Sequence, residues 1–562
     1  MKRKEYQADL CVVGGGIAGL CTALAAARHG ISVVLIHDRP VLGGNASSEI
    51  RMHICGARGK DNRETGIVEE LMLENFYTNP GLKYPLWDAT LYSVAIQQPG
   101  LTLLLNSSVF DADCEGNVIR SVTAWQSNAE TFHTVYASYF ADCSGDSILA
   151  PLTGALYRYG REAKSEFGET IAPDVADNKT MGMSCLFQIR ETDHKVPFVK
   201  PEWAYTYKTD DDLPFKYHGL ESNFWWIEVG GEWDCIHDTD RCREECIKIC
   251  YGVWDHIKNQ GEHGADNWEL EWIGFLPGKR ESRRYVGEYI VTQNDVEAGG
   301  RFYDMVAYAG WPMDDHFPEG FYYTKGEQTT YHPVPGPWGL PLRCMISRNI
   351  QNLVFAGRNI SVTHAALSSS RVMATCGVLG QALGTAVAQS VKDGVDIRSV
   401  DILRLQDMLM QDDCYLPGFT RKIPELTLQA ACNAEVCRNG KERGDENLWI
   451  GRDGDYIEYS FDSDVHIRQI RLVFDSNLNR PYHNMPCRVL LKEPNFRLPS
   501  TLIKSYKIIG TDSLGNTRII EVSNSHQRFV RHTVDWKIKT VRLIPLETHG
   551  CHEYRVFNFE LL

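Results

Sequence analysis

Several features that would point to a membrane or nucleic-acid-binding protein are missing from the sequence. It contains no uninterrupted apolar stretch of roughly 18 residues, so a membrane-spanning helix is not expected. It contains no basic run, and 58 Lys and Arg residues against 73 Asp and Glu residues give a net charge of −15, which opposes binding to nucleic acid or anionic lipid. The charged start, Met1–Gln7, leads directly into an apolar strand, so we expect no signal peptide and a cytoplasmic location.

Cysteine pairs of the redox type are also missing. None of the 17 cysteines forms a Cys-x-x-Cys pair, which disfavours a thiol–disulfide reductase mechanism. Their odd number and scattered positions indicate reduced thiols. Cys242, Cys246 and Cys250 would stack along one face of a helix, and this spacing favours packing over the binding of zinc or an iron–sulfur cluster. The sequence therefore indicates no metal ligands.

A nucleotide-binding unit is present near the start of the chain. Ala8–Val13 is an apolar strand, Ile17–His29 has small and apolar residues at helical spacing, and Ser32–Ile36 is a second buried strand. Gly30 ends the helix, and the three elements fit within one βαβ unit. This context supports reading the glycine-rich turn between the first strand and the helix as a dinucleotide motif.

The glycine-rich turn has a physical reason at each position. Gly14 allows the sharp reversal, Gly16 lets a pyrophosphate approach the backbone, and Gly19 brings the helix close to the strand. Ile17 and Ala18 are the first residues of the helix, and the unpaired N–H groups at this end of the helix attract negatively charged oxygens. We therefore expect these five residues to bind the phosphates of a dinucleotide.

The segment after the second strand indicates which cofactor binds. His37 occupies the position of the acid that usually holds the ribose hydroxyls, so we expect Asp38 to take that role by a one-residue shift. A loop of small and polar residues follows, and simple NAD dehydrogenases usually lack it. The residues that we expect to bind the cofactor in this segment are His37, Asp38, Arg39, Gly43, Gly44, Asn45, Ser47 and Arg51.

Together with Glu49–Gly56, this loop resembles the FAD-dependent oxidoreductases of the glutathione-reductase-like fold group, in the branch often found in bacterial carbohydrate-related genomic settings. The resemblance extends over roughly Ala8–Gln389. It implies an α/β fold with an FAD-binding Rossmann core, a bound FAD and redox chemistry. It does not supply a substrate.

Two later segments resemble further FAD markers. Tyr139–Asp146 is an apolar strand that runs into Cys143-Ser144-Gly145, and the resemblance places Ser144 and Gly145 at the phosphate–ribose edge of FAD. Asp146 could be an anchor in that site or the cap of a helix over Ser147–Leu152. Val109, at the end of a predicted strand over Leu101–Val109, lies where such proteins commonly contact the adenine through backbone groups.

The third marker is Asn352–Ser361, in which a buried strand ends at Gly357. Arg358 stands where many relatives outside this branch carry Asp, and it could reach a phosphate instead. The three serines Ser368–Ser370 are expected to cap a helix over Arg371–Gln389. In flavoproteins of this fold, the last helix points its N-terminus at the flavin N1–C2 carbonyl, where charge accumulates on reduction.

Four residues are candidates for catalysis. His364 is the first choice, because an ordinary pKa near 6.5 lets it take a proton from a hydroxyl while hydride leaves to flavin N5; a packing or capping role is the alternative. Arg371 could orient a carboxylate or hydroxyl, or serve FAD only. His53 and Arg63 follow the flavin loop in the resembled family, and the alternative for Arg63 is an exposed loop pair with Glu64.

The 562 residues are too many for one core and suggest about two to four domains. We expect a discontinuous FAD-binding domain over residues 1–155 and 348–395, an inserted β-rich, aromatic-rich substrate region over 156–347, and a connecting helical segment over 396–429. Residues 430–562 alternate in short strands, including one over Cys487–Leu491, and predict an all-β sandwich. This last part resembles a discoidin-type, galactose-binding-like module, which could bind glycans or serve packing and oligomerisation.

These features predict an FAD-dependent oxidoreductase that transfers hydride between flavin N5 and a small organic substrate, with a hydroxyl of a sugar or glycoside as the preferred target. The alternative is the reduction of an activated C=C or C=O in a carboxylate substrate, for which the Arg-rich string Gly278–Tyr285 would anchor the carboxylate. A third alternative is a non-catalytic, FAD-containing glycan-binding protein. Because no second GxGxxG marks an NAD(P)H site, the electron acceptor stays unidentified.

Overall fold

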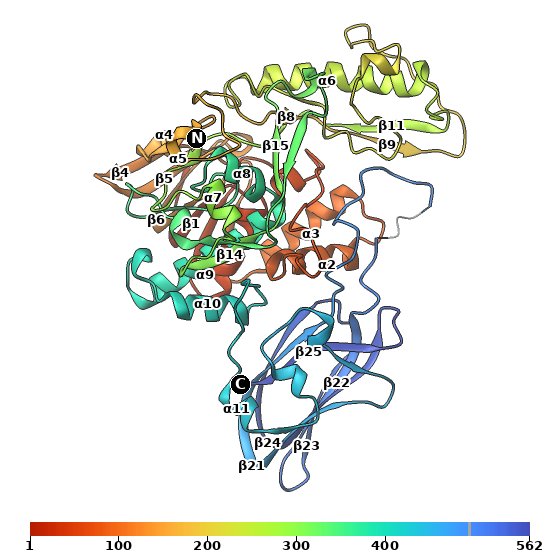
Figure 1. Cartoon of the computed structure of the whole chain (residues 1–562). Helices are drawn as coiled ribbons and strands as arrows, with labels where there is room; N and C mark the ends of the chain where they lie inside the picture. The colour runs from red at the N-terminus through yellow and green to blue at the C-terminus, as the bar shows by residue number, and fades with distance from the viewer. Residues whose placement is uncertain (493–495) are drawn as a thin grey trace. The chain divides into compact units, whose positions relative to one another are not determined.

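The computed structural model describes residues 1–492 and 496–562, which form two compact units (Figure 1). Unit 1 contains Met1–Arg58, Gly81–Leu405 and the segment that begins at His483. Unit 2 contains Gly59–Pro80, Gln406–Tyr482 and the segment that begins at Phe496. Each unit is therefore assembled from three separate pieces of chain.

A seven-stranded sheet forms the centre of unit 1. Its strands β3, β2, β1, β6 and β18 are parallel, and β5 and β4 extend it as an antiparallel pair on β6. This is the mixed α/β, Rossmann-like core that the sequence predicts. The strands are β1 (Lys2–Val13), β2 (Val33–Ile36), β3 (Leu101–Leu104), β4 (Ser108–Glu115), β5 (Val118–Gln126), β6 (Thr131–Asp142) and β18 (Leu353–Phe355).

Two helices pack against each other beside this sheet because small residues line their contact. At Gly380 and Gly384 of α9, an added Cβ would lie 2.2 Å from the carbonyl oxygens of Ala18 and Thr22 of α1. Only glycine permits this backbone approach. The helices of unit 1 are α1 (Ile17–Arg28), α3 (Tyr84–Gln97), α4 (Leu149–Thr153), α5 (Lys164–Phe167), α6 (Thr239–Asp255), α7 (Gln293–Glu297), α8 (His364–Ser370) and α9 (Met373–Asp393).

Among the described residues, no single helix is long and apolar enough to cross a membrane; α8 and α9 reach that length and composition only as a pair, which bends by 93°.

Short antiparallel strands and long loops make up the rest of unit 1. Figure 1 shows α6 running along β9 and β11. Cys242, Cys246 and Cys250 of α6 are buried in one apolar cluster with Phe187 and Trp254, which confirms the predicted packing role. The strands are β7 (Tyr157–Arg158), β8 (Met183–Ser184), β9 (Phe187–Glu191), β10 (Glu228–Val229), β11 (Trp268–Ile273), β12 (Gly278–Lys279), β13 (Arg284–Tyr285), β14 (Met305–Ala309), β15 (Met313–His316), β16 (Thr329–His332) and β17 (Trp338–Pro341).

Unit 2 is a seven-stranded antiparallel sheet with the order β20-β25-β21-β24-β22-β23, in which β19 pairs with β21. The all-β character agrees with the sequence, but β21 and β24 are long strands where short ones are predicted. The elements are α2 (Ile67–Thr78), α11 (Glu425–Gln429), β19 (Ala431–Cys432), β20 (Trp449–Gly451), β21 (Ile457–Phe474), β22 (Ile503–Thr511), β23 (Thr517–Val522), β24 (Phe529–Thr548) and β25 (Tyr554–Leu561); α10 (Ile402–Gln411) spans the boundary between the units.

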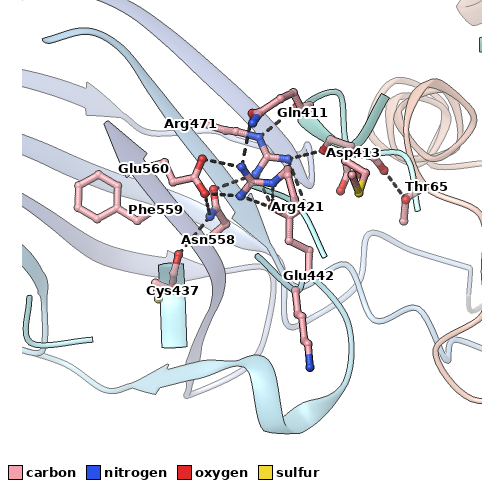
Figure 2. Close-up of polar contacts among 12 residues, drawn as sticks. Thr65, Gln411, Asp413, Arg421, Cys437, Glu442, Arg471, Asn558, Phe559 and Glu560 are labelled. Atoms are coloured by element: carbon pink, nitrogen blue, oxygen red, sulfur yellow. Dashed lines mark hydrogen bonds and ion pairs between the residues drawn. The ribbon is translucent and has the colours of Figure 1, made fainter. Parts of the chain in front are cut away.

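Buried ion pairs hold the pieces of unit 2 together (Figure 2). Arg471, on β21, donates to the carbonyl of Gln411 at 3.0 Å and to Asn558 Oδ1 at 2.8 Å, and it pairs with Glu442. Arg421 donates to Glu560 Oε2 at 2.8 Å. The side chains of Arg471 and Glu560 are completely buried, so each charge depends on its partner.

Three predicted elements differ from the structure. The strand expected over Leu101–Val109 is two strands, because Asn106 between β3 and β4 adopts a left-handed φ of 52°. Ser368–Ser370 end α8 and do not cap the next helix, whose N-cap is Val372. Cys487–Leu491 is not a strand of the C-terminal sheet, because its Val489 forms an isolated bridge with Arg190 in unit 1.

Candidate active site

A cavity of about 300 Å³ opens in unit 1 at the carboxyl ends of β1, β2, β6 and β18. In parallel α/β sheets, the loops at this edge form the ligand site. Sixteen of the residues named from the sequence line this cavity, and their contacts with a cofactor stay predictions. They are Gly14, Gly16, Ile17, Ala18, His37, Asp38, Arg39, Gly43, Gly44, Asn45, Val109, Ser144, Gly145, Gly357, Arg358 and Arg371.

In the turn between β1 and α1, the backbone is open toward the cavity at Gly16 and closely packed against other backbone atoms at Gly14 and Gly19. At Gly16, an added Cβ would have Gly44 Cα, 3.9 Å away, as its nearest neighbour. At Gly14, whose φ is 105°, it would lie 2.5 Å from the backbone nitrogen of Ser144. At Gly19 it would lie 1.8 Å from the carbonyl oxygen of Gly14, so Gly19 packs behind the turn and does not line the cavity.

His37 holds two loops of the cavity together. Its Nδ1 accepts from the backbone N–H of Gly15 at 3.0 Å, and its Nε2 lies 3.0 Å from the carbonyl oxygen of Val41. These partners assign the proton to Nε2, which donates to Val41. The ring therefore serves the walls of the cavity, whereas the carboxylate of Asp38, with 61% of its side chain exposed, remains accessible at the end of β2.

Asp146 and Arg358 form an ion pair at the opposite wall. Arg358 donates to Asp146 Oδ1 at 2.6 Å, and Lys279 donates to Asp146 Oδ2 at 2.8 Å. Burial raises the pKa of Asp146, but the charges of Arg358 and Lys279 outweigh it and hold that pKa below its usual range. The backbone N–H at the start of α4 donates to Asp142 instead, at 2.9 Å, so Asp146 is not the cap of that helix.

Five other predicted residues also lie outside the cavity lining. Ser47 is completely buried. Arg51 donates to Gln188 Oε1 at 2.9 Å, and its guanidinium lies 4.4 Å from the centre of the Trp272 ring. The ring of His53 stacks on His483 at 4.1 Å, and burial together with the charge of His483 lowers the pKa of His53 to about 3, so His53 is neutral at pH 7.

Arg63 belongs to unit 2, where it anchors a loop. Its guanidinium donates to the carbonyl oxygens of Arg480 and Tyr482 at 2.7 and 3.2 Å. Glu64 is only 1% exposed, so the alternative of an exposed pair with Arg63 is wrong. These contacts give Arg63 a structural role within its own unit.

His364 is the last of the predicted residues outside the cavity lining, and it is held between two carboxylates. Its Nδ1 lies 2.9 Å from Glu281 Oε2, and its Nε2 lies 3.0 Å from Asp315 Oδ1. Burial would lower the pKa of His364, but Glu281 and Asp315 raise it to about 10. The imidazole is therefore held in its protonated form at neutral pH, in which both nitrogens donate, and the role of His364 as the base stays a prediction.

A second imidazole, His316, contacts a residue of the cavity lining. Arg371, which lines the cavity, has Nη2 3.0 Å from His316 Nε2, and His316 Nδ1 lies 2.6 Å from Glu228 Oε2. Because arginine only donates, His316 Nε2 accepts and the ring proton sits on Nδ1. Arg371 also donates to Asp314 Oδ2 at 3.2 Å, and that oxygen accepts from the Trp311 indole at 3.2 Å.

The sequence places His316 on a Pro-flanked loop, where active-site groups can be presented, but it indicates no role for Glu228, Glu281, Asp314 and Asp315. Long-range pairing brings them together: His316 and Glu228 are 88 positions apart, and His364 and Glu281 are 83 apart. Two features of the sequence could have pointed to these residues. One is the pair of acidic residues directly before His316, and the other is the charged string that contains Glu281. Only the fold shows which partners these charges have.

The groups that line the cavity suit the phosphates of a dinucleotide. The backbone is open at Gly16, the N-termini of α1 and α9 carry no side-chain cap, and Met373 at the start of α9 also lines the cavity. Helix N-termini of this kind attract phosphate and other negative groups. Fold and site together define a dinucleotide-dependent α/β enzyme.

The chain matches the FAD dependent oxidoreductase family over residues 9–409 and belongs to that family. It is accordingly an oxidoreductase with FAD as its cofactor. Over 68 residues the chain is 37% identical to a glycerol-3-phosphate dehydrogenase of Mycobacterium leprae (strain TN), and this match spans only 12% of each protein.

Two solved structures illustrate how distant the structural relatives are. A geranylgeranyl bacteriochlorophyll reductase-like protein from Thermoplasma acidophilum is 13% identical with a TM-score of 0.32, covering 73% of this chain and 85% of that one. The family 32 carbohydrate-binding module of Streptococcus pneumoniae EndoD is 12% identical with a TM-score of 0.19, covering 23% of this chain and 84% of the module. Scores this low carry no argument about this protein.

Proposed function

We propose that this FAD-dependent oxidoreductase oxidises a hydroxyl group of a sugar or glycoside. The observation that carries the proposal is the position of Arg371, which lines the cavity and contacts both His316 and Asp314. A guanidinium, an imidazole and a carboxylate therefore meet at one edge of the cofactor cavity. Hydrogen-bonding groups of this kind orient a hydroxylated substrate and accept its proton.

Each side chain has a defined part in this chemistry. When bound, FAD supplies the ring system that exchanges a hydride with the substrate. In the structure the lone pair of His316 Nε2 accepts from Arg371. When a substrate binds, this Arg371 N–H turns to the hydroxyl oxygen, and the lone pair freed on His316 Nε2 takes the hydroxyl proton. Glu228, with its side chain completely buried, accepts from His316 Nδ1 and stabilises the imidazolium that forms. This arrangement assigns to His316 the base function expected of His364.

A sugar is the preferred substrate class because an aromatic ring adjoins this polar group. Trp311 donates to Asp314, and the guanidinium of Arg58 lies 4.2 Å from the centre of the Trp311 ring. Indole faces and carboxylates are the groups that a site uses to hold the apolar faces and the hydroxyls of a sugar. The same groups would bind a glycoside.

The reductive alternative needs the charged string Gly278–Tyr285 as an anchor for a carboxylate, and three of its cations are already bound inside the protein. Lys279 pairs with Asp146, Arg280 donates to the carbonyl of Trp225 at 2.9 Å, and Arg284 pairs with Glu162 at 3.2 Å. A carboxylate substrate would have to break these contacts. The oxidation of a hydroxyl therefore has the stronger support.

The test is the visible flavin absorbance of the purified protein under anaerobic conditions, while sugars, glycosides, polyols and carboxylates are added one at a time. We expect a hydroxylated compound to bleach the flavin. In His316→Gln the rate of bleaching should fall by roughly 10²–10⁴-fold with the flavin still bound, because a general base has been removed. The exposed His194, whose side chain is 70% exposed, provides the matched control His194→Gln.

Three outcomes would contradict the proposal. If no hydroxylated compound bleaches the flavin and a reduced flavin is reoxidised by an unsaturated carboxylate, the enzyme works in the reductive direction. If neither occurs, the flavin has a structural role in a glycan-binding protein. An unchanged rate in His316→Gln would remove His316 from the mechanism.

A further inference from the structure

A cluster of four metal-ligating side chains lies in unit 1, outside the site described above. It contains Asp210, His218, His256 and His263, and one potential ligand atom from each lies within 4.8 Å of all the others. Asp210 begins the 3-10 turn Asp210–Asp212, and His256 begins the π-helical turn His256–Gln260 that continues α6. Two separate stretches of chain, 210–218 and 256–263, therefore converge on one point.

The distances between the ligand atoms match a tetrahedral metal site. Asp210 Oδ1 lies 3.0 Å from His256 Nε2 and 3.6 Å from His263 Nε2, and the two Nε2 atoms are 3.1 Å apart. His218 Nε2 lies 3.5 Å from the same carboxylate oxygen. Bonds of about 2.0–2.2 Å from Zn²⁺ to nitrogen and oxygen place tetrahedral ligands about 3.3–3.5 Å apart.

The outer hydrogen bonds of two imidazoles orient them as metal ligands. His218 Nδ1 lies 2.5 Å from the carbonyl oxygen of Lys216, and His256 Nδ1 lies 3.1 Å from that of Tyr207. A carbonyl only accepts, so each Nδ1 carries the proton and each Nε2 keeps its lone pair for the cluster. Metal-binding histidines are fixed by second-shell hydrogen bonds of this kind.

Burial makes these lone pairs costly without a cation. The side chain of His256 is completely buried, and those of His218 and His263 are 10% and 16% exposed. The Nε2 lone pairs of His218 and His256 both point toward the same carboxylate oxygen of Asp210, and buried polar atoms need a partner. Asp210, 73% exposed, leaves a path by which a cation enters.

Gly261 is needed for the position of His263. An added Cβ at Gly261 would lie 2.3 Å from His263 Nε2 and 3.3 Å from His256 Nε2. A larger residue would push the imidazole of His263 out of the cluster. The glycine thus provides a second, independent feature of the chain that serves the same arrangement.

We propose that Asp210, His218, His256 and His263 bind one Zn²⁺ in a closed structural site. Three nitrogen ligands and one carboxylate suit zinc, and four protein ligands leave no position for a substrate. Between Glu191 and Glu228 the described chain contains only the 3-10 turn Asp210–Asp212, so few backbone hydrogen bonds hold this stretch. The metal ties it to the end of α6. This inference does not depend on the proposed oxidation.

The test uses the full chain, dialysed against a chelator and then titrated with Zn²⁺ in competition with a chromogenic chelator. We expect one equivalent of zinc per chain, and Co²⁺ in its place should give the intense visible absorption of a tetrahedral site. Asp210→Asn and His263→Gln should each weaken binding by on the order of a hundredfold, and Gly261→Ala by about tenfold. His194→Gln is the matched control, and the flavin spectrum verifies that each variant is folded.

A second readout is the protease sensitivity of residues 192–227, which should rise in the chelated protein and fall on the addition of Zn²⁺. Less than one equivalent of zinc in the wild-type chain would overturn the proposal. So would an affinity that is unchanged in the double variant of Asp210→Asn and His263→Gln, because the metal would then bind elsewhere. Asp210 is the most exposed residue of the cluster, and His263 lies in a loop. The test therefore does not depend on replacing the buried His256.

Discussion

At the scale of single residues, the charge state of His364 follows from its two carboxylate neighbours. Its pKa is raised from an ordinary value near 6.5 to about 10, so the folded chain binds this proton more tightly than the unfolded chain. The resulting stabilisation is complete below about pH 6.5 and is lost as the pH rises through about 10. The slope can reach about 1.4 kcal/mol per pH unit in this window.

We therefore expect the thermal midpoint of the wild-type protein to fall between pH 7 and pH 10 more steeply than that of His364→Gln, which has no proton to lose at this site. His194→Gln should behave as the wild type, because that side chain is 70% exposed. Parallel curves for wild type and His364→Gln would show that His364 is neutral in the folded chain. Calorimetric scans at a series of pH values make the measurement.

The same residue shows where prediction from sequence ends. Gly14, Gly16 and Gly145 could be placed in the cavity from the sequence, because each is required by a local feature, a turn between a strand and a helix. The charge on His364 could not, because Glu281 and Asp315 are 83 and 49 positions away in the chain. A histidine in a promising loop has an ordinary pKa only until its distant partners are known.

At the scale of elements, the turn between β1 and α1 determines whether the cofactor binds. An added methyl group at Gly16 meets its nearest atom, Gly44 Cα, at 3.9 Å, so Gly16→Ala should fold normally while it narrows the space for the pyrophosphate. We expect at least a tenfold loss of FAD affinity with little change in the thermal midpoint of the protein without FAD.

Gly326 is a matched control for this substitution. Its added methyl group would meet a single atom at 4.0 Å, in a turn away from the cavity lining. Gly326→Ala should retain wild-type FAD affinity when both variants are titrated with FAD and followed by flavin fluorescence. Equal affinities in Gly16→Ala and Gly326→Ala would contradict the assignment of the cavity to the pyrophosphate.

Local patterns predicted the elements well where a strand or helix is short and regular. The first βαβ unit agrees with the structure. The prediction that Ser368–Ser370 cap the next helix is wrong, although serine is a common N-cap. The residue that caps a helix here is Thr363, whose hydroxyl oxygen accepts from the N–H of Ala366 at the start of α8, at 3.2 Å. The serines then end that helix, and a bend separates it from α9.

At the scale of the whole molecule, the pieces of each unit are interleaved along the chain. Residues 430–562 were predicted as a separate module, but three buried charges in this range have partners outside it. Arg480 pairs with Glu69, Arg528 with Asp413, and Glu560 with Arg421. No pattern within 430–562 reveals these partners, because each side chain alone is compatible with an exposed position.

We expect residues 430–562, expressed alone, to lack a folded structure. Each unpaired buried charge costs about 3–5 kcal/mol, so three of them exceed the stability of a small domain. Circular dichroism during heating and resistance to protease make the measurement, with residues 406–562 as the comparison because they restore Asp413 and Arg421. Cooperative unfolding of the isolated 430–562 fragment would show that the module is independent.

The pairing of Glu69 with Arg480 also affects the timing of synthesis. These side chains are 411 positions apart, and a ribosome that adds 5–20 residues per second needs roughly 20–80 s to pass from one to the other. Throughout that interval α2 has emerged without Arg480, Tyr482 and His526, which contact it in unit 2. For most of its translation the nascent chain therefore carries the apolar face of this helix without its partners in the folded unit.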